Sequence, residues 1–401
     1  MSAPSAEFDL QTIKHFLHNH EERIIIYSIF ALLFLLSLAV RVSMVKFQSG
    51  DYSAFSSWYD FVKAHGLHSF KYSFSNYNPP YTYFLYLVSL LPLPKILAIK
   101  ALLIFFDFVM AYAIYLVVKV FRPEGYTALI AATASLFAPT VLLNGPLWGQ
   151  FDEFYTAFIL FSLWAGLKDK SRWCWILYGV AIAIKLQAIF FAPVLLVMIF
   201  RRIHWYDIVW SVVTFCILTF PPVLVGRSVS SILSIYSQQT SLFAGQLSLN
   251  APSLWQWFPN QDFKYFNGPA VYLTGAIILI YVLYTYLYKK FSNKDLLIVT
   301  SLMLYLVPFL LPQMHDRYFF PAGIGSFVMA FAYPEWAWLA VLMQVVTIFV
   351  YTPFLFGTYI VPMSILSIVI VGIVYILSKQ LLSPSATTPI KKLASTGRKR
   401  A

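Results

Sequence analysis

Long uninterrupted apolar runs constrain this chain more than any other feature of its sequence. The segment from residue 24 to residue 40, IIIYSIFALLFLLSLAV, contains no charged residue. A helix that crosses a bilayer needs about 20 mostly apolar residues. The strands of a membrane barrel would alternate apolar and polar residues over roughly ten positions. Continuous runs therefore predict membrane-spanning helices and exclude a transmembrane barrel.

Similar runs recur along the whole chain of 401 residues, of which 60% are hydrophobic and 11% are charged. Soluble domains carry about 25% charged residues, so a soluble globular protein is excluded, as is a disordered chain. We predict an all-α fold, a polytopic transmembrane bundle of about 12 spans. The runs lie at about 24–45, 96–118, 126–143, 152–167, 173–184, 188–200, 206–225, 271–288, 295–311, 318–333, 336–352 and 358–378.

Two segments depart from regular spans. Residues 81–94 are short and follow two prolines, so we expect an interfacial helix there. The halves of 173–200 are each shorter than a normal span, and we expect two short helices that meet near Lys185. Merging them would place Arg201 and Arg202 outside the membrane and would reverse the topology downstream.

Most of the 28 Lys and Arg residues fall in loops that are cytoplasmic if the N-terminus is cytoplasmic, as the positive-inside rule requires. The predicted division is a cytoplasmic segment at 1–23, a transmembrane domain at 24–378 and a basic cytoplasmic tail at 379–401. Acidic residues precede the first run, so we expect a retained anchor and no signal peptide. The formal net charge of +12 comes from basic residues that are scattered between runs, and nucleic acid is not expected as a partner.

This topology gathers nearly all the unusual chemistry on the non-cytoplasmic face, in segments 46–80, 144–151, 226–270 and 312–317. Asp51 follows soon after the first span. A carboxylate just outside the bilayer is a general base if it reaches an acceptor hydroxyl, and otherwise it is a solvated loop aspartate. No Gly-rich phosphate loop occurs, so a cytoplasmic nucleotide donor is not expected.

Acidic residues also stand at the end of a predicted span, in the sequence WGQFDEF that contains Asp152 and Glu153. Carboxylates there are costly unless they face protein, water or an ion, so they indicate a site; a marker of the membrane boundary is the alternative. Lys185 lies alone between two apolar half-runs, where it should face an anion or a cavity, or else extend toward the headgroups.

His315, Asp316 and Arg317 form a charged group between two later runs. Arg presents planar donors that suit phosphate, and His adds a donor or an acid, although Asp316 could simply pair with Arg317. The long outer loop adds side chains that could hydrogen-bond or stack on sugar rings, or form an interfacial aromatic belt: Gln238, Gln239, Asn250, Trp255 and Trp257.

Four motifs in this order carry a family resemblance: Asp51, the Tyr-Asn-Pro-Pro end of the first outer loop, WGQFDE, and MHDRYFFP. Together they resemble the GT-C superfamily of glycosyltransferases that use lipid-linked sugars. The nearest resemblance is to bacterial relatives of the mannosyltransferase that adds the second mannose of GPI anchors. It extends over most of residues 24–378 and implies a GT-C bundle with an outer-face catalytic loop region.

The resemblance implies a role for each candidate residue. Asp51 would be the catalytic base. Donor-binding residues would be Lys185, His315, Arg317, Trp148 and Gln150, and acceptor or supporting residues would be Asp152, Glu153, Tyr77, Asn78, Gln187 and Asn250. Some members bind a divalent metal through Asp-x-Asp; the adjacent Asp152 and Glu153 are the only match here, for Mg or Mn if any.

The predicted reaction moves a hexose, with mannose favoured, from a polyprenyl-phosphate sugar to a glycan or glycolipid acceptor on the non-cytoplasmic face of the cell membrane, or of the ER membrane in a eukaryote. Phosphate leaves while Asp51 deprotonates the incoming hydroxyl, so one displacement inverts the anomeric centre. A transporter or flippase is the alternative, because intramembrane charges also mark substrate pathways. The gathering of charges at one membrane face favours the transferase.

Overall fold

Each predicted apolar run contains a helix in the computed structural model, which describes residues 10–258, 261–288 and 291–383. The elements, joined by short 3₁₀ and π turns, are α1 (Leu10–Met44), α2 (Tyr52–His65), α3 (Pro79–Ser89), α4 (Lys95–Phe121), α5 (Thr127–Ser135), α6 (Pro139–Leu142), α7 (Asp152–Leu167), α8 (Ser171–Ile184), α9 (Ala192–Ile199), α10 (Ile208–Thr219), α11 (Val229–Leu233), α12 (Ile235–Ser241), β1 (Ser248–Leu249), α13 (Phe263–Tyr288), α14 (Asn293–Leu310), β2 (Met314–His315), α15 (Phe320–Ala332), α16 (Ala337–Phe356) and α17 (Met363–Leu382).

The described part of the chain has 8 helical stretches that are long and apolar enough to cross a membrane. They are 21–44, 95–121, 127–148, 205–225, 263–287, 293–310, 334–356 and 363–382. The other four predicted runs form the shorter helices α7, α8, α9 and α15. The expectation of about 12 spans took every apolar run as a membrane crossing. By helix length, the structure supports fewer crossings than that.

Both irregular segments form short helices. The stretch at 81–94 contains most of α3, whose 11 residues are too few to cross a bilayer, and its place at the membrane interface stays a prediction. The helix α8 ends at Ile184, and Lys185 adopts an extended conformation before a 3₁₀ turn leads into α9. This break leaves the Lys185 side chain free to point away from either helix axis.

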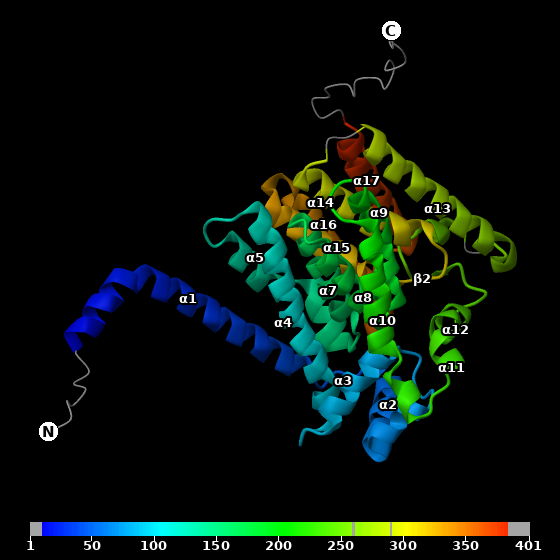
Figure 1. Ribbon diagram of the computed structural model, residues 1–401, viewed down its shortest axis with the longest axis horizontal. Helices are drawn as coiled ribbons and strands as arrows, with labels where there is room; N and C mark the ends of the chain where they lie inside the picture. Colours follow the sequence, from blue (N-terminus) through cyan, green and yellow to red (C-terminus); the bar gives the residue numbers. More distant parts are fainter. Residues whose placement is uncertain (1–9, 259–260, 289–290, 384–401) are drawn as a thin grey trace, which may run out of the picture.

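The short helix α7 lies at the centre of the bundle and packs against α4 and α8 (Figure 1). The first helix, α1, projects away from the body, and little of its apolar span is buried. The helices α2, α3 and α11 lie at the end of the bundle opposite to the one where α17 ends. Parts of two predicted outer segments, 46–80 and 226–270, therefore lie at this end.

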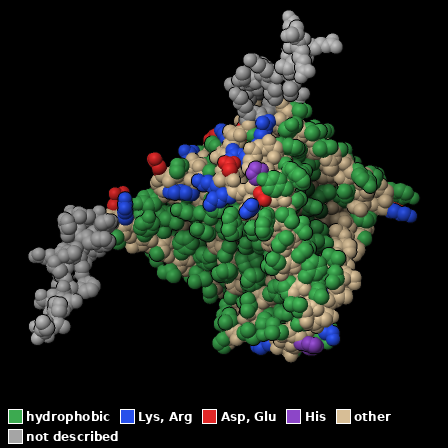
Figure 2. Space-filling model, in the orientation of Figure 1, with side chains coloured by type: hydrophobic (Ala, Val, Ile, Leu, Met, Phe, Trp, Pro, Cys, Tyr) green, Lys and Arg blue, Asp and Glu red, His purple; other side chains and the backbone are tan. Residues whose placement is uncertain are grey.

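The surface agrees with a protein that is embedded in lipid. Figure 2 shows hydrophobic side chains over the flank of the bundle, and most of the Lys and Arg side chains on this face lie toward the end where α17 ends. The positive-inside rule associates such a gathering with the cytoplasmic side of a membrane protein.

Candidate active site

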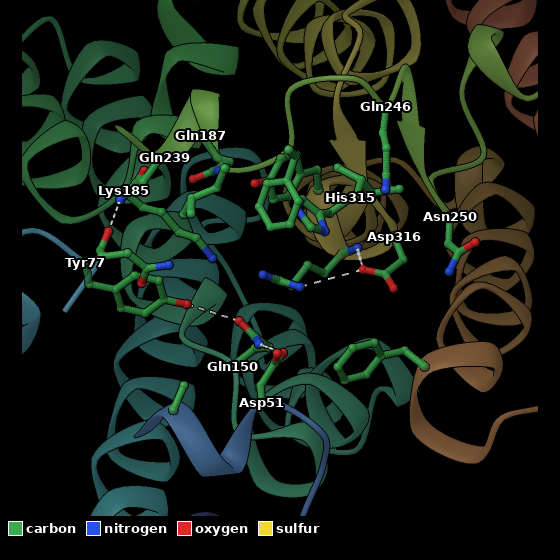
Figure 3. A pocket seen from close by; sticks show the side chains of 18 of the residues that line it. Asp51, Tyr77, Gln150, Lys185, Gln187, Gln239, Gln246, Asn250, His315 and Asp316 are labelled. Atoms are coloured by element: carbon green, nitrogen blue, oxygen red, sulfur yellow. Dashed lines mark hydrogen bonds and ion pairs between the residues drawn. The ribbon is translucent and has the colours of Figure 1, made fainter. Parts of the chain in front are cut away.

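A cavity of about 430 Å³ brings together residues from distant parts of the sequence (Figure 3). It lies where the start of α2, the break at Lys185 and the β1–β2 pair meet. Eight of the predicted site residues line it: Asp51, Tyr77, Gln150, Lys185, Gln187, Asn250, His315 and Arg317.

Asp51 stands immediately before α2 and is only partly exposed. Trp148 Nε1 donates a hydrogen bond of 2.9 Å to its Oδ2 atom, and Gln150 Nε2 donates one of 2.5 Å to the same atom. Among the described residues, Oδ1 receives no hydrogen bond. One oxygen of Asp51 is thus held in place while the other remains available to accept a proton.

The backbone of 143–150 explains how Trp148 and Gln150 both reach Asp51. Residues Leu143–Trp148 form a π turn that contains Pro146, and Gly149 follows with a positive φ of 91°. Only glycine adopts this conformation without strain, and π turns are frequent at functional sites. The turn reverses the chain and directs both side chains to the same carboxylate.

Lys100 links this turn to the chain just before Asp51 through hydrogen bonds. Its ammonium group donates hydrogen bonds to the carbonyl oxygens of Phe47, Pro146 and Leu147, at 2.6, 2.9 and 2.9 Å. Lys100 is 1% exposed. Lys100 was not among the predicted site residues, although a lysine inside an apolar run is itself a signal of a site.

The cationic side of the cavity is built around Asp152. Its Oδ1 accepts a bond of 2.5 Å from Lys185 Nζ, and its Oδ2 lies 3.9 Å from Arg317 Nε. Arg317 also approaches Asp316, with Nη1 at 3.8 Å from Oδ1. Two cations therefore share one fully buried carboxylate at the cavity wall.

His315 adds a neutral donor to this side. Burial, together with Arg317 and Lys185, lowers its pKa to about 2, so the imidazole is uncharged near neutral pH. In the described structure, neither His315 Nε2 nor Arg317 Nε has a hydrogen-bond partner. Buried polar atoms are normally paired, and an anion in the cavity would satisfy both atoms.

Four predicted contact residues lie behind the cavity wall instead of lining it. Trp148 is buried and supports Asp51, while Asp152 holds Lys185. Asn78 donates to the carbonyl oxygen of Ala183, and Glu153 is fully buried and does not line the cavity. Sequence proximity to lining residues suggested contact, but neighbouring residues on a helix point in different directions.

The residues proposed for a divalent metal do not form a suitable ligand set. Both oxygens of Asp152 already face Lys185, Arg317 or the side-chain amide of Asn144. In the described ranges, no group of three His, Cys, Asp or Glu side chains could hold a metal ion.

Several lining residues were not among the predicted site residues. Asp316 and Gln239 were noted in the sequence only as a pairing residue and a possible sugar contact. Aromatic side chains complete the wall, and only their position in the folded chain identifies them: Phe55, Trp58, Tyr318, Phe243 and Phe354.

A second cavity of about 300 Å³ adjoins the first, with which it shares Gln187, Gln239, Phe243 and Tyr318. Most of its other lining residues are apolar and come from α13, from the 3₁₀ turn after Lys185 and from residues 311–314. The charged cavity and a mostly apolar cavity thus share part of one wall.

Comparisons with known proteins agree with this architecture. The sequence profile of glycosyltransferase family 87 matches residues 74–312. Crystal structures of ArnT from Cupriavidus metallidurans have the same fold. The undecaprenyl phosphate complex gives a TM-score of 0.55 at 16% identity, with 88% of this chain and 70% of ArnT covered. The apo structure gives 0.56 at 17% identity, covering 89% and 71%. No curated protein sequence matches significantly.

The family profile and the fold therefore define a membrane glycosyltransferase with the GT-C fold. Because the family profile covers more than half of the sequence, the chain belongs to glycosyltransferase family 87. The matched region includes Tyr77, Gln150 and Lys185 but neither Asp51 nor the residues from 313 onward. The roles of Asp51, His315 and Arg317 therefore rest on the positions of these side chains in the cavity.

Proposed function

We propose that this glycosyltransferase moves a hexose from a polyprenyl-phosphate sugar to a hydroxyl group of a glycan or glycolipid acceptor. One observation supports the proposal above all others. The same cavity is lined by Asp51, which has a free carboxylate oxygen, and by two cations, Lys185 and Arg317, which we call the cationic wall. Transfer to a hydroxyl needs a base for its proton and positive charge for the departing phosphate.

The paired cavities favour a lipid-linked donor. The sugar and phosphate would occupy the charged cavity, and the apolar cavity next to it would accept the first part of the polyprenyl chain. ArnT, which has the same fold, was crystallised with undecaprenyl phosphate. Mannose is our choice of hexose because of the sequence resemblance described above.

The reaction follows from these positions. The acceptor oxygen attacks the anomeric carbon as its proton passes to Oδ1 of Asp51, and the bond from that carbon to the phosphate oxygen breaks. Lys185, Arg317 and the neutral N–H of His315 stabilise the charge that grows on the phosphate. One displacement inverts the anomeric centre, and no covalent enzyme intermediate forms.

The membrane placement completes the proposal. Residues 1–23 and 379–401 would be cytoplasmic, and the catalytic end of domain 24–378 would face the opposite side. The distribution of Lys and Arg supports this orientation. Residues 1–9 and 384–401 lie outside the described residues.

Donor binding is the direct test. Lys185→Ala and Arg317→Ala should each weaken the binding of polyprenyl-phosphate sugar by about tenfold or more, since each removes a charge-assisted contact to phosphate. Lys294→Ala is the matched control, because Lys294 pairs with Glu335 on the surface. Binding measured in detergent or nanodiscs decides the matter: wild-type affinity in both Lys185→Ala and Arg317→Ala would refute the assignment.

A further inference from the structure

A second group of charged residues lies deeper in the bundle, behind Asp152. Its central member is Glu153, which is 0% exposed. In the described structure, neither of its carboxylate oxygens has a hydrogen-bond partner. An ionised carboxylate in this condition is very costly, so the group must be protonated or must face something that satisfies it.

The side chain opposite Glu153 is Asp107 of α4. Both carboxylates lie over Gly145: a Cβ atom on that residue would be 3.0 Å from Oε1 of Glu153 and 3.4 Å from Oδ1 of Asp107. Oδ1 of Asp107 is also a buried atom without a partner. Two unpaired carboxyl oxygens therefore converge above a residue that has no side chain.

The charges around this point distinguish a proton from a metal ion. Arg41 of α1 donates from Nε to Oδ2 of Asp107 at 2.8 Å, and both side chains are fully buried. From α7, Asp152 faces Glu153, and the more distant Lys185 is bound to Asp152. A metal ion does not fit here, because Arg41 already occupies Oδ2 of Asp107 and, in the described ranges, no group of three His, Cys, Asp or Glu side chains could hold one.

The count of charges leads to the same conclusion. Asp107 is matched by Arg41, Asp152 by Lys185, and Arg317 by Asp316, whose Oδ1 lies 3.8 Å from its Nη1. The carboxylate of Glu153 would be an additional negative charge without a counterion. Two carboxylates at close range do not both stay ionised in a buried site, and one proton between them removes the repulsion.

We propose that Glu153 and Asp107 bind one proton between them, with Glu153 as the acid that donates to Oδ1 of Asp107. Glu153 then carries no charge, and Asp152 is the only anion that competes for Lys185. Glu153 is thus a positioning residue for the cationic wall. This consequence for Lys185 rests on the proposed function, whereas the proton site itself does not.

Infrared spectroscopy tests the proton site directly. The spectrum of the wild type minus that of Glu153→Gln should contain the carbonyl band of a protonated carboxylic acid, and the band should shift in D₂O. Glu335→Gln, at an exposed ion pair, is the control and should give an ionised carboxylate band. A difference spectrum of Glu153→Gln that contains only ionised carboxylate bands would overturn the proposal.

Kinetics test the positioning role. A glutamine amide can donate to Asp107 as the acid does, so Glu153→Gln should keep KM for the donor within about threefold of the wild type, while Glu153→Leu should raise it about tenfold. Equal KM values in both variants would remove the positioning role. If Lys185→Ala and Arg317→Ala both bind donor normally while the acid band is present, the proposed function fails and the proton site stands.

Discussion

Asp51 and Arg317 acquire their chemical properties from neighbours that the folded chain supplies. Asp51 is held by Trp148 and Gln150 through one oxygen, so its second oxygen has a defined direction. Arg317 shares Asp152 with Lys185. Single side chains at this scale are the parts of the mechanism that substitution can test.

Replacement of Asp51 by Asn should lower turnover by roughly 100-fold or more, because it removes the proton acceptor while keeping size and hydrogen bonding. Donor affinity and folding should change little, since Asp51 is partly exposed and makes no ion pair with any residue that the structure describes. The measurement is transfer by the purified enzyme under saturating donor.

Asp60 offers the matched control for that substitution. It lies on α2, which begins directly after Asp51, and it pairs with Lys95; the side chains of Asp60 and Lys95 are 59% and 36% exposed. Asp60→Asn should retain normal transfer. If Asp60→Asn loses activity and Asp51→Asn keeps it, the base has been assigned to the wrong aspartate.

Asp316 predicts a pH dependence of donor binding. Burial raises its pKa from 3.8 to about 7, against the opposing effect of Arg317. Between pH 3.8 and about 7, the folded protein therefore keeps this proton while the unfolded chain has lost it. The contribution of the protonated carboxyl group to the free energy of unfolding is accordingly lost as the pH rises through about 7.

The protonated form leaves more of the Arg317 charge for phosphate. Donor affinity should accordingly be higher one unit below pH 7 than one unit above it. Asp316→Asn should flatten this dependence, whereas His315 does not contribute because its pKa is about 2. Titration of donor binding against pH checks this, and an unchanged profile in Asp316→Asn would contradict it.

At the scale of elements, the site depends on places where regular helices stop. The π turn before Gly149, the extended residue between α8 and α9, and the short β1–β2 pair each direct polar side chains into one cavity. Each irregularity needs partners for its backbone groups inside the protein. Lys100 supplies those partners for the π turn.

Lys100→Met should therefore affect both stability and catalysis. It leaves three carbonyl oxygens without their donor, and the free energy of unfolding should fall by about 2 kcal/mol or more. Displacement of Trp148 should lower kcat more than it raises KM, because Asp51 loses its orientation. Thermal melting and steady-state kinetics provide the two measurements.

Lys119→Met is the comparison for that variant, since Lys119 lies in the last turn of the same helix, far from the cavity lining. It should melt near the wild-type temperature and keep its kcat. If Lys100→Met behaves in the same way, the turn is held by other contacts.

For the whole molecule, the predicted orientation places residues 46–80 and the C-terminal tail on opposite sides of the membrane. A membrane-impermeant thiol reagent should label Ser75→Cys from outside intact cells or vesicles, and Ser385→Cys only after permeabilisation. Ser385 lies outside the described residues. Labelling of both from the same side would contradict the topology.

The sequence by itself determined the class of fold, since each membrane helix satisfies its own backbone and must be apolar along its length. It also indicated the main charged side chains of the cavity, because Asp51, Lys185 and Arg317 are conspicuous between apolar runs. Only the tertiary structure decided which charges meet. The pairing of Lys185 with Asp152, of Arg41 with Asp107, and the place of Lys100 beneath the π turn depend on how separate helices pack, and no local pattern in the sequence encodes those contacts.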